Sequence, residues 1–88
     1  IGEKFHATIS SVTSFGIFAE TDFGIEGLIS MRDLDDDYYE YDEKTLTLIG
    51  KRTSKTYAIG DELTIKVKRA DSKHREIDFT IESGDDDE

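Results

Sequence analysis

The sequence predicts an all-β domain, a small barrel of five antiparallel strands with a long insertion between the third and fourth strands. The first observation behind this prediction is the alternation of apolar and polar residues over residues 63–68 and 77–81, which is typical of strands with one buried face. The second is length, because 88 residues allow one domain with a small core. A closed barrel suits such a chain because closure leaves no free sheet edge.

Three further strands precede the insertion. Residues 5–9 and 17–20 alternate in the same way and are predicted to pair with each other. Gly24 stands where a tight turn needs a positive φ, and the third strand then starts at Ile25. The last two strands are joined by residues 71–75, a polar connection of hairpin length.

The insertion covers residues 35–61, and connections of this length are usually functional or mobile. Its tyrosine, leucine and isoleucine side chains provide enough apolar surface for partial order. Residues 83–88 lack apolar side chains and carry like charges, so we expect a disordered acidic tail. The domain itself is therefore predicted to span residues 1–82.

The formal net charge of −10 opposes binding to nucleic acids, whose phosphates are also negative. The acidic residues are unevenly spread, however, and eleven of the 21 fall within residues 33–43 and 85–88. Nearly all lysines and arginines lie in the rest of the chain, whose charge is close to balanced. Binding to a polyanion is therefore expected to be local and modest.

Composition excludes several other classes of function. The chain has no cysteine, which removes disulfides, thiolate nucleophiles and cysteine zinc sites and agrees with a reducing compartment. The two histidines, His6 and His74, fall in a strand and a loop without metal-site spacing. No secretory signal or long apolar run supports export or a membrane partner. We expect a noncatalytic, metal-free, cytoplasmic domain taken from a longer protein.

An acidic run suggests calcium binding at first sight. Asp33, Asp35 and Asp37 alternate like the first ligands of an EF-hand loop. Such a loop needs glycine at its sixth position and glutamate at its twelfth, where this chain has Tyr38 and Lys44. A solvated charge run therefore explains these carboxylates better.

Phe18 is predicted to face solvent, because Ile17 and Ala19 share the buried side of the same strand. Phe15 lies three residues earlier across Gly16, where a glycine-permitted bulge could bring both rings onto one surface. Two exposed rings could stack nucleobases of any identity. The alternative is that one ring closes the end of the barrel.

Three stretches resemble the signature of the S1-motif family, an RNA-binding form of the five-stranded OB fold. They are residues 9–20, with the run Ser-Phe-Gly-Ile-Phe-Ala, residues 24–34, and residues 60–63, Gly-Asp-Glu-Leu. With the last strand pair, the likeness covers nearly the whole domain.

The insertion resembles the one in the S1-motif domain of ribonuclease R. The resemblance rests on residues 33–41, with the run Asp-Asp-Asp-Tyr-Tyr-Glu-Tyr, on residues 48–50, and on Arg52 and Tyr57. That family degrades RNA hydrolytically from the 3′ end in a separate domain that uses magnesium. The resemblance therefore implies a domain that binds RNA, contains no cofactor of its own and does not cut.

The resemblance also implies which residues hold single-stranded RNA. Phe15 and Phe18 match the family's stacking positions, and Ser30 stands before the family's short helical turn, where a histidine is typical. Serine can hydrogen-bond a phosphate or 2′-hydroxyl but cannot stack. Asp71 matches the acid that follows the fourth strand, and Arg75 lies near the basic residue that precedes the fifth.

Each polar candidate also has an ordinary structural interpretation. Asp71 could instead cap its own turn, and Arg75 could be a solvated loop charge rather than a phosphate or base contact. Lys66 and Lys68 are expected on the outer face of the fourth strand, where they could follow an RNA backbone or contact only water.

The insertion carries a second group of cations, Lys51, Arg52 and Lys55, with the same two interpretations. Its tyrosines could stack bases, but the neighbouring carboxylates favour packing onto the barrel or a sister domain. These tyrosines are Tyr38, Tyr39 and Tyr41.

Two classes of function remain open. The first is a noncatalytic, single-stranded RNA-binding domain of a ribonuclease-R-like exoribonuclease, with little sequence preference and with the parent's other domains as partners. The second is a protein-docking OB module that uses its acidic, tyrosine-rich insertion. Salt separates them, because RNA binding releases counterions and weakens steeply with ionic strength. A monomer is expected in either case.

Overall fold

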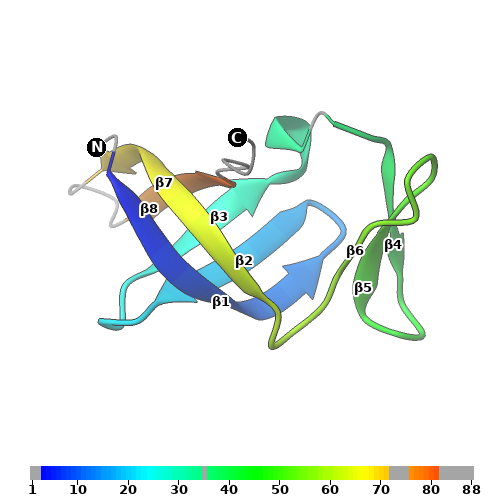
Figure 1. Ribbon diagram of the computed structural model, residues 1–88, viewed down its shortest axis with the longest axis horizontal. Coiled ribbons are helices and arrows are strands. Elements are labelled where there is room, and N and C mark those ends of the chain that lie inside the picture. The colour runs from blue at the N-terminus through cyan, green and yellow to red at the C-terminus, as the bar shows by residue number, and fades with distance from the viewer. Residues whose placement is uncertain (1–2, 35, 72–75, 82–88) are drawn as a thin grey trace.

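The computed structural model describes residues 3–34, 36–71 and 76–81. Five strands close a barrel in the order β1-β2-β3-β8-β7 (Figure 1), which confirms the predicted barrel. The barrel strands are β1 (Lys4–Thr13), β2 (Gly16–Thr21), β3 (Glu26–Ser30), β7 (Glu62–Asp71) and β8 (Glu76–Ile81).

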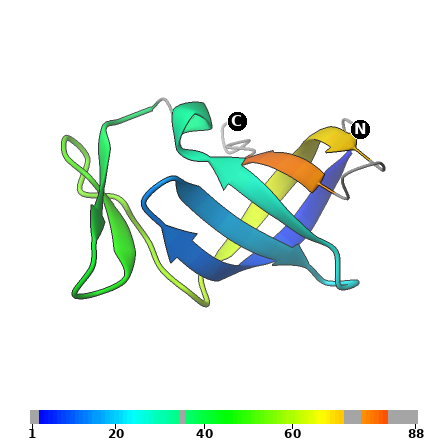
Figure 2. The same ribbon diagram turned by 180° about the vertical axis from the view of Figure 1, so that it is seen from behind.

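One strand pair differs from the predicted antiparallel arrangement. β3 and β8 run parallel, with Leu28 opposite Asp78 and Ile29 opposite Phe79, whereas the other barrel pairs are antiparallel. The reason is geometric, because five strands cannot alternate in direction all the way around a closed ring. Figure 2 shows β3 and β8 side by side on the back of the barrel.

The insertion forms its own small sheet at one end of the barrel (Figures 1 and 2). After the 3-10 turn η1 (Met31–Asp33), the strands β4 (Tyr39–Asp42), β5 (Thr47–Gly50) and β6 (Thr56–Tyr57) pair antiparallel in that order. The sequence predicted only partial order for the insertion, whereas its described part forms a three-stranded sheet.

The carboxylate of Asp37 links the start of β4 to the turn between β5 and β6 at one end of this sheet. It accepts hydrogen bonds from the backbone amides of Tyr38, Arg52 and Thr53 at 2.7 to 3.1 Å, and from the Thr53 hydroxyl at 2.8 Å. Gly50 leaves room for it, since a Cβ there would lie 2.6 Å from Asp37 Oδ2. Partial desolvation of Asp37 opposes ionisation, but the bonds from Thr53, Arg52 and Tyr38 outweigh it and lower the pKa to about 2.

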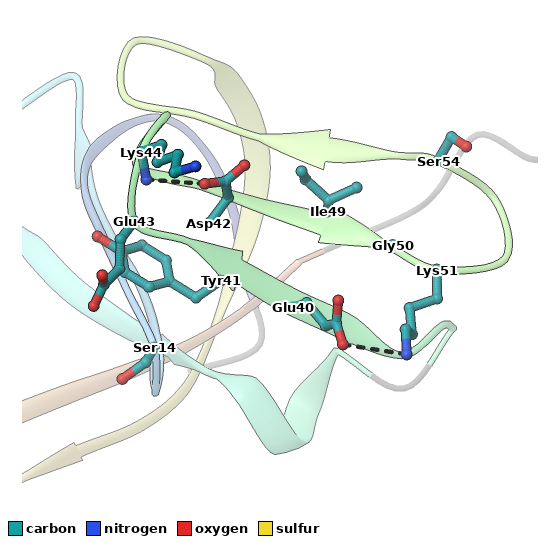
Figure 3. Close-up of a pocket in the computed structure, with 10 residues that line it drawn as sticks. All are labelled: Ser14, Glu40, Tyr41, Asp42, Glu43, Lys44, Ile49, Gly50, Lys51 and Ser54. Atoms are coloured by element: carbon teal, nitrogen blue, oxygen red, sulfur yellow. Dashed lines mark hydrogen bonds and ion pairs between the residues drawn. The ribbon is translucent and has the colours of Figure 1, made fainter.

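A hollow of about 880 Å³ separates β4 and β5 from the turn between β1 and β2 (Figure 3). Ser14 approaches it from that turn, and Glu40, Asp42 and Glu43 line it from the insertion. Lys44 and Lys51 also line it, and Lys51 pairs with Glu40, so carboxylates outnumber lysines three to two. This side of the insertion is therefore acidic, and we call the hollow the acidic hollow.

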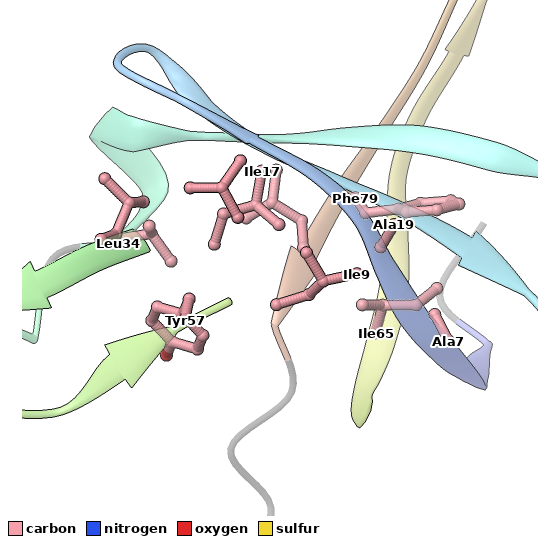
Figure 4. Packing of buried hydrophobic residues seen from close by; sticks show 11 residues of the cluster. Ala7, Ile9, Ile17, Ala19, Leu34, Tyr57, Ile65 and Phe79 are labelled. Atoms are coloured by element: carbon pink, nitrogen blue, oxygen red, sulfur yellow. The ribbon is translucent and has the colours of Figure 1, made fainter. Parts of the chain in front are cut away.

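Barrel and insertion share one core (Figure 4). Leu48 on β5 and Tyr57 on β6 are buried in the same cluster as the barrel side chains. Tyr39 and Tyr41 pack against this cluster, which confirms the packing expected for them, whereas Tyr38 is 82% exposed. The barrel contributes Ala7, Ile9, Val12, Ile17, Ala19, Ile29, Ile65 and Phe79, and Leu34 follows η1.

Helical structure is sparse in the described part of the chain. Its helical element is the three-residue turn η1, so none of these residues belongs to a helix of membrane-spanning length.

Candidate nucleic-acid interface

A row of side chains crosses the outer face of the barrel from β1 to β7. Strand register places Phe18 opposite Ser11 and Leu28, Leu28 opposite Asp78, and Asp78 opposite Arg69. Residues opposite each other in a sheet share a face, and the neighbours of this row along the strands, such as Ile17, Ile29 and Phe79, are buried. The side chains of this row are partly or fully exposed. We call it the cross-strand row, and its members are Ser11, Phe18, Leu28, Asp78 and Arg69.

Phe15 and Phe18 form an exposed aromatic pair at the start of β2. Their ring centroids lie 6.3 Å apart and the rings are edge to face at 89°. Phe15 is 59% exposed, Phe18 is partly exposed, and neither belongs to the core cluster. The solvent-facing position predicted for Phe18 is confirmed, and neither ring closes the barrel end.

The predicted bulge at Gly16 is wrong, because the irregularity lies at Ser10 on the partner strand β1. Gly16 is needed for another reason, since a Cβ there would lie 2.4 Å from the carbonyl oxygen of Ile29. Gly16 thus allows β2 to approach β3 closely. The turn that carries Phe15 is fixed beside η1, where the Met31 amide donates to the Phe15 carbonyl at 2.9 Å.

A shallow groove of about 330 Å³ lies beside Phe18. Its apolar lining comes from Gly27, Leu28 and Ile77, and its acidic lining from Glu26, Glu76 and Asp78. Gly27 cannot be replaced without displacing the core, since a Cβ would lie 2.7 Å from the Phe79 ring. Carboxylates accept hydrogen bonds from base N–H groups but repel phosphates, so the groove suits a base and not a backbone.

Arg69 is the cation of the cross-strand row. Its Nε donates to Asp78 Oδ2 at 3.1 Å, and its side chain is largely exposed. A guanidinium has five N–H donors, so this contact leaves donors for a phosphate. Sequence alternation could have placed Asp78 on the outer face, but not Arg69, which reaches that face only because a bulge at Lys68 shifts the register of β7.

The predicted site residues are partly brought together. Ser30 ends β3 opposite Gly16 and, two residues beyond Leu28, lies on the same face. Its hydroxyl makes no capping hydrogen bond to η1, so it is not committed to that turn. Asp71 ends β7 opposite Glu76 in the backbone register, but its side chain and the whole of Arg75 lie outside the described residues.

The two predicted lysines behave differently from each other. Lys66 is partly buried, on the side of β7 opposite the buried Ile65, as predicted. Lys68 lies at the bulge, and its Nζ is 3.0 Å from a carboxylate oxygen of Asp33 in η1. This partner reduces the charge that Lys68 can offer to a phosphate.

Among the insertion cations, both lysines are paired with acids. Lys51 Nζ lies 3.2 Å from Glu40, and Lys55 Nζ lies 3.6 Å from Asp36. Arg52 instead donates to the backbone carbonyl of Asp36 at 2.7 Å. Its positive charge is therefore not neutralised by that contact.

His6 on β1 connects the turn between β2 and β3 to the start of β7, elsewhere on the barrel. Its ring nitrogens lie 2.7 Å from Asp22 and 2.9 Å from Glu62. The hydrogen bond to Asp22, followed by the one to Glu62, raises the pKa of His6 above its ordinary value. The contacts use different nitrogens, so they do not converge on one metal position, and no group of three potential metal ligands gathers within residues 3–34, 36–71 and 76–81.

Comparison with known proteins agrees with this geometry. The family model of the S1 RNA binding domain matches residues 1–82. Ribonuclease R 1 of Lactococcus lactis is 46% identical over 90% of this chain, and ribonuclease R of Thermotoga maritima is 46% identical over 92%. The chain spans only 10% and 11% of those proteins.

A solved structure is similarly close. Mycoplasma genitalium RNase R in complex with ribose methylated single-stranded RNA superposes with a TM-score of 0.87 and 35% identity, over 93% of this chain and 13% of that one. The resemblance inferred from sequence is thereby confirmed, and the chain belongs to the S1 RNA-binding domain family.

Proposed function

We propose that this chain is the single-stranded RNA-binding domain of a ribonuclease-R-like exoribonuclease, and that it holds RNA without strong sequence preference. The observation that carries the proposal is the exposed pair Phe15 and Phe18 beside the groove at Leu28. The Mycoplasma relative, whose solved complex contains single-stranded RNA, supports it.

The chemistry of the surface assigns a role to each group. One base stacks on the aromatic pair, which is worth about 1 to 3 kcal/mol per base for any base identity. Arg69 contacts a phosphate, and the Ser30 hydroxyl bonds a phosphate or a 2′-hydroxyl. Asp71, Arg75, Lys66 and Lys68 remain predicted contacts, of which Lys68 must first leave Asp33.

The role of the parent protein is part of the same proposal. The domain is noncatalytic, and hydrolysis with magnesium takes place in another domain of the parent, toward which this domain guides RNA. A cytoplasmic location and a monomeric domain complete it. The similarity to bacterial ribonuclease R supports the assignment of the parent protein to that class of exoribonuclease.

A backbone-amide NMR titration with a short oligouridylate at low and moderate salt tests the binding surface. We expect shifts around Phe15, Phe18, Leu28, Ser30 and Arg69 that weaken as salt rises. Salt-insensitive shifts confined to the insertion, or none at low salt, would overturn the proposal and favour the protein-docking module.

A further inference from the structure

We infer that the RNA-binding surface continues from Phe15 across η1 into a second hollow, between η1 and the start of β4 and distinct from the acidic hollow. There a second base stacks on Tyr38, and Arg32 and Arg52 hold phosphate. This inference rests on the proposed function and extends it. The sequence alone favours packing for Tyr38 and indicates no RNA-binding role for Arg32.

The two surfaces are continuous. The hollow has a volume of about 820 Å³, and we call it the insertion groove. Met31, which lines its barrel side, donates its amide to the carbonyl of Phe15. The aromatic pair and the groove are therefore neighbours through Met31, which places the groove within reach of an RNA strand that leaves Phe15. The groove is lined by Met31, Arg32, Leu34, Asp36, Asp37, Tyr38, Tyr39, Lys51 and Arg52.

Tyr38 is placed as a stacking ring. It is 82% exposed at the groove, whereas Tyr39 and Tyr41 pack against the core. The backbone of Tyr38 is nevertheless held firmly, since its amide donates to Asp37 and its carbonyl accepts from the Lys51 amide at 2.8 Å. A ring on an ordered backbone binds a base at little entropic cost.

The acids that line the insertion groove are already engaged by protein donors. Asp37 accepts its bonds from backbone amides and the Thr53 hydroxyl, and Asp36 accepts from the Tyr39 hydroxyl at 3.1 Å. The guanidinium of Arg52 donates to the backbone carbonyl of Asp36 and not to either carboxylate. Arg32 is exposed and makes no hydrogen bond or ion pair within the described part of the chain.

The balance of charge differs between the two hollows of the insertion. The acidic hollow of Figure 3 is lined by three carboxylates and two lysines, of which Lys51 pairs with Glu40, whereas the insertion groove is lined by three cations and two carboxylates. A phosphodiester is therefore favoured in the insertion groove over the acidic hollow. Arginine binds phosphate through a planar fork and also stacks on bases. Single-stranded RNA is therefore the occupant that the insertion groove favours, and an acidic protein segment is the competitor.

The test compares oligouridylates of about 4 and about 10 nucleotides, which lie at the lower end and in the middle of the range of about 4 to 16 nucleotides seen for one OB fold. Affinities of the 88-residue chain are measured by fluorescence anisotropy over a salt series. The variants are Tyr38→Ala, Tyr38→Phe and Arg32→Gln. Lys44→Gln is the charge-matched control in the acidic hollow, and Leu46→Ala removes an exposed apolar side chain from the same insertion.

We expect Tyr38→Ala to weaken binding of the long RNA roughly 5-fold or more, while Tyr38→Phe retains it and the short RNA is unaffected. Arg32→Gln should lower the slope of log affinity against log salt by about 0.7, the value for one phosphate on a single strand. Lys44→Gln and Leu46→Ala should change neither quantity.

Two outcomes separate this inference from the proposed function. If the short RNA binds and depends on Phe18, but the long RNA ignores Tyr38 and Arg32, the RNA-binding surface ends at the aromatic pair and the inference is wrong. If neither RNA binds at low salt, the proposed function itself fails, and the inference fails with it.

Discussion

At the scale of single residues, a few polar side chains connect segments that are distant in the sequence. Asp37 satisfies three backbone amides from two separate stretches of the insertion. His6 joins the β2–β3 turn, through Asp22, to the start of β7, through Glu62. Both sites make stability depend on pH, with opposite signs.

Asp37→Asn should destabilise the chain at neutral pH, because an amide cannot replace an anion that accepts from several backbone donors. The pKa of Asp37 is lowered from 3.8 to about 2, so its contribution is complete above pH 3.8 and is lost as pH falls through 2. Thermal melting of both proteins from pH 6 to pH 2 checks this. A difference in melting temperature that stays constant down to pH 2 would contradict it.

The contribution of His6 runs the other way. Its pKa is raised from 6.5, so its stabilising contacts are complete below pH 6.5 and are lost as pH rises through the folded pKa. We expect an NMR titration of the His6 ring to give a midpoint above 6.5, and Asp22→Asn to bring it closer to 6.5. An unchanged midpoint in that variant would show that Asp22 is not the cause.

At the scale of elements, the insertion is part of the barrel's core and not an appendage. Leu48 on β5 is fully buried in the shared cluster, whereas Leu46 in the preceding turn is 48% exposed. The two leucines therefore allow a matched comparison within one hairpin.

Leu48→Ala should lower the free energy of unfolding by about 2 to 5 kcal/mol, the usual cost of a cavity in a core. Leu46→Ala should cost less than about 0.5 kcal/mol, as is usual for exposed sites. Urea denaturation with global fitting measures both. Similar, small losses for the two variants would mean that the insertion packs loosely and unfolds independently of the barrel.

Regular alternation made the barrel strands predictable, since Ile17, Ala19, Ile65 and Phe79 are buried where the period of two placed them. The irregular features of these strands were not predictable from the sequence. The bulges at Ser10 and Lys68 break that period without glycine or proline to mark them.

The insertion strands escaped prediction for a different reason. The turn residues Leu46 and Ser54 have φ values of 57° and 63°, a conformation that neither residue type signals. The outward position of Phe18 follows from alternation and was predictable, whereas that of Arg69 depends on the register shift in β7 and was not.

At the scale of the whole molecule, a chain with a net charge of −10 presents a surface that suits single-stranded RNA only along a restricted path. The groups around Phe18 are mainly aromatic, apolar and acidic, and in the described part of the chain the cross-strand row has one cation, Arg69. Binding should therefore depend on stacking more than on charge, and its salt dependence should correspond to a small number of phosphates.

The measurement that tests this central claim most directly is the affinity of the chain for a short oligouridylate in the parent, Phe18→Ala and Phe23→Ala. Phe23 is 63% exposed and packs edge to face on Phe5, so it is a matched phenylalanine outside the cross-strand row. We predict that Phe18→Ala weakens binding roughly 5-fold or more and that Phe23→Ala leaves it within about 2-fold, since surface changes away from a site are usually small. Equal losses in the two variants, or none in Phe18→Ala, would contradict the account.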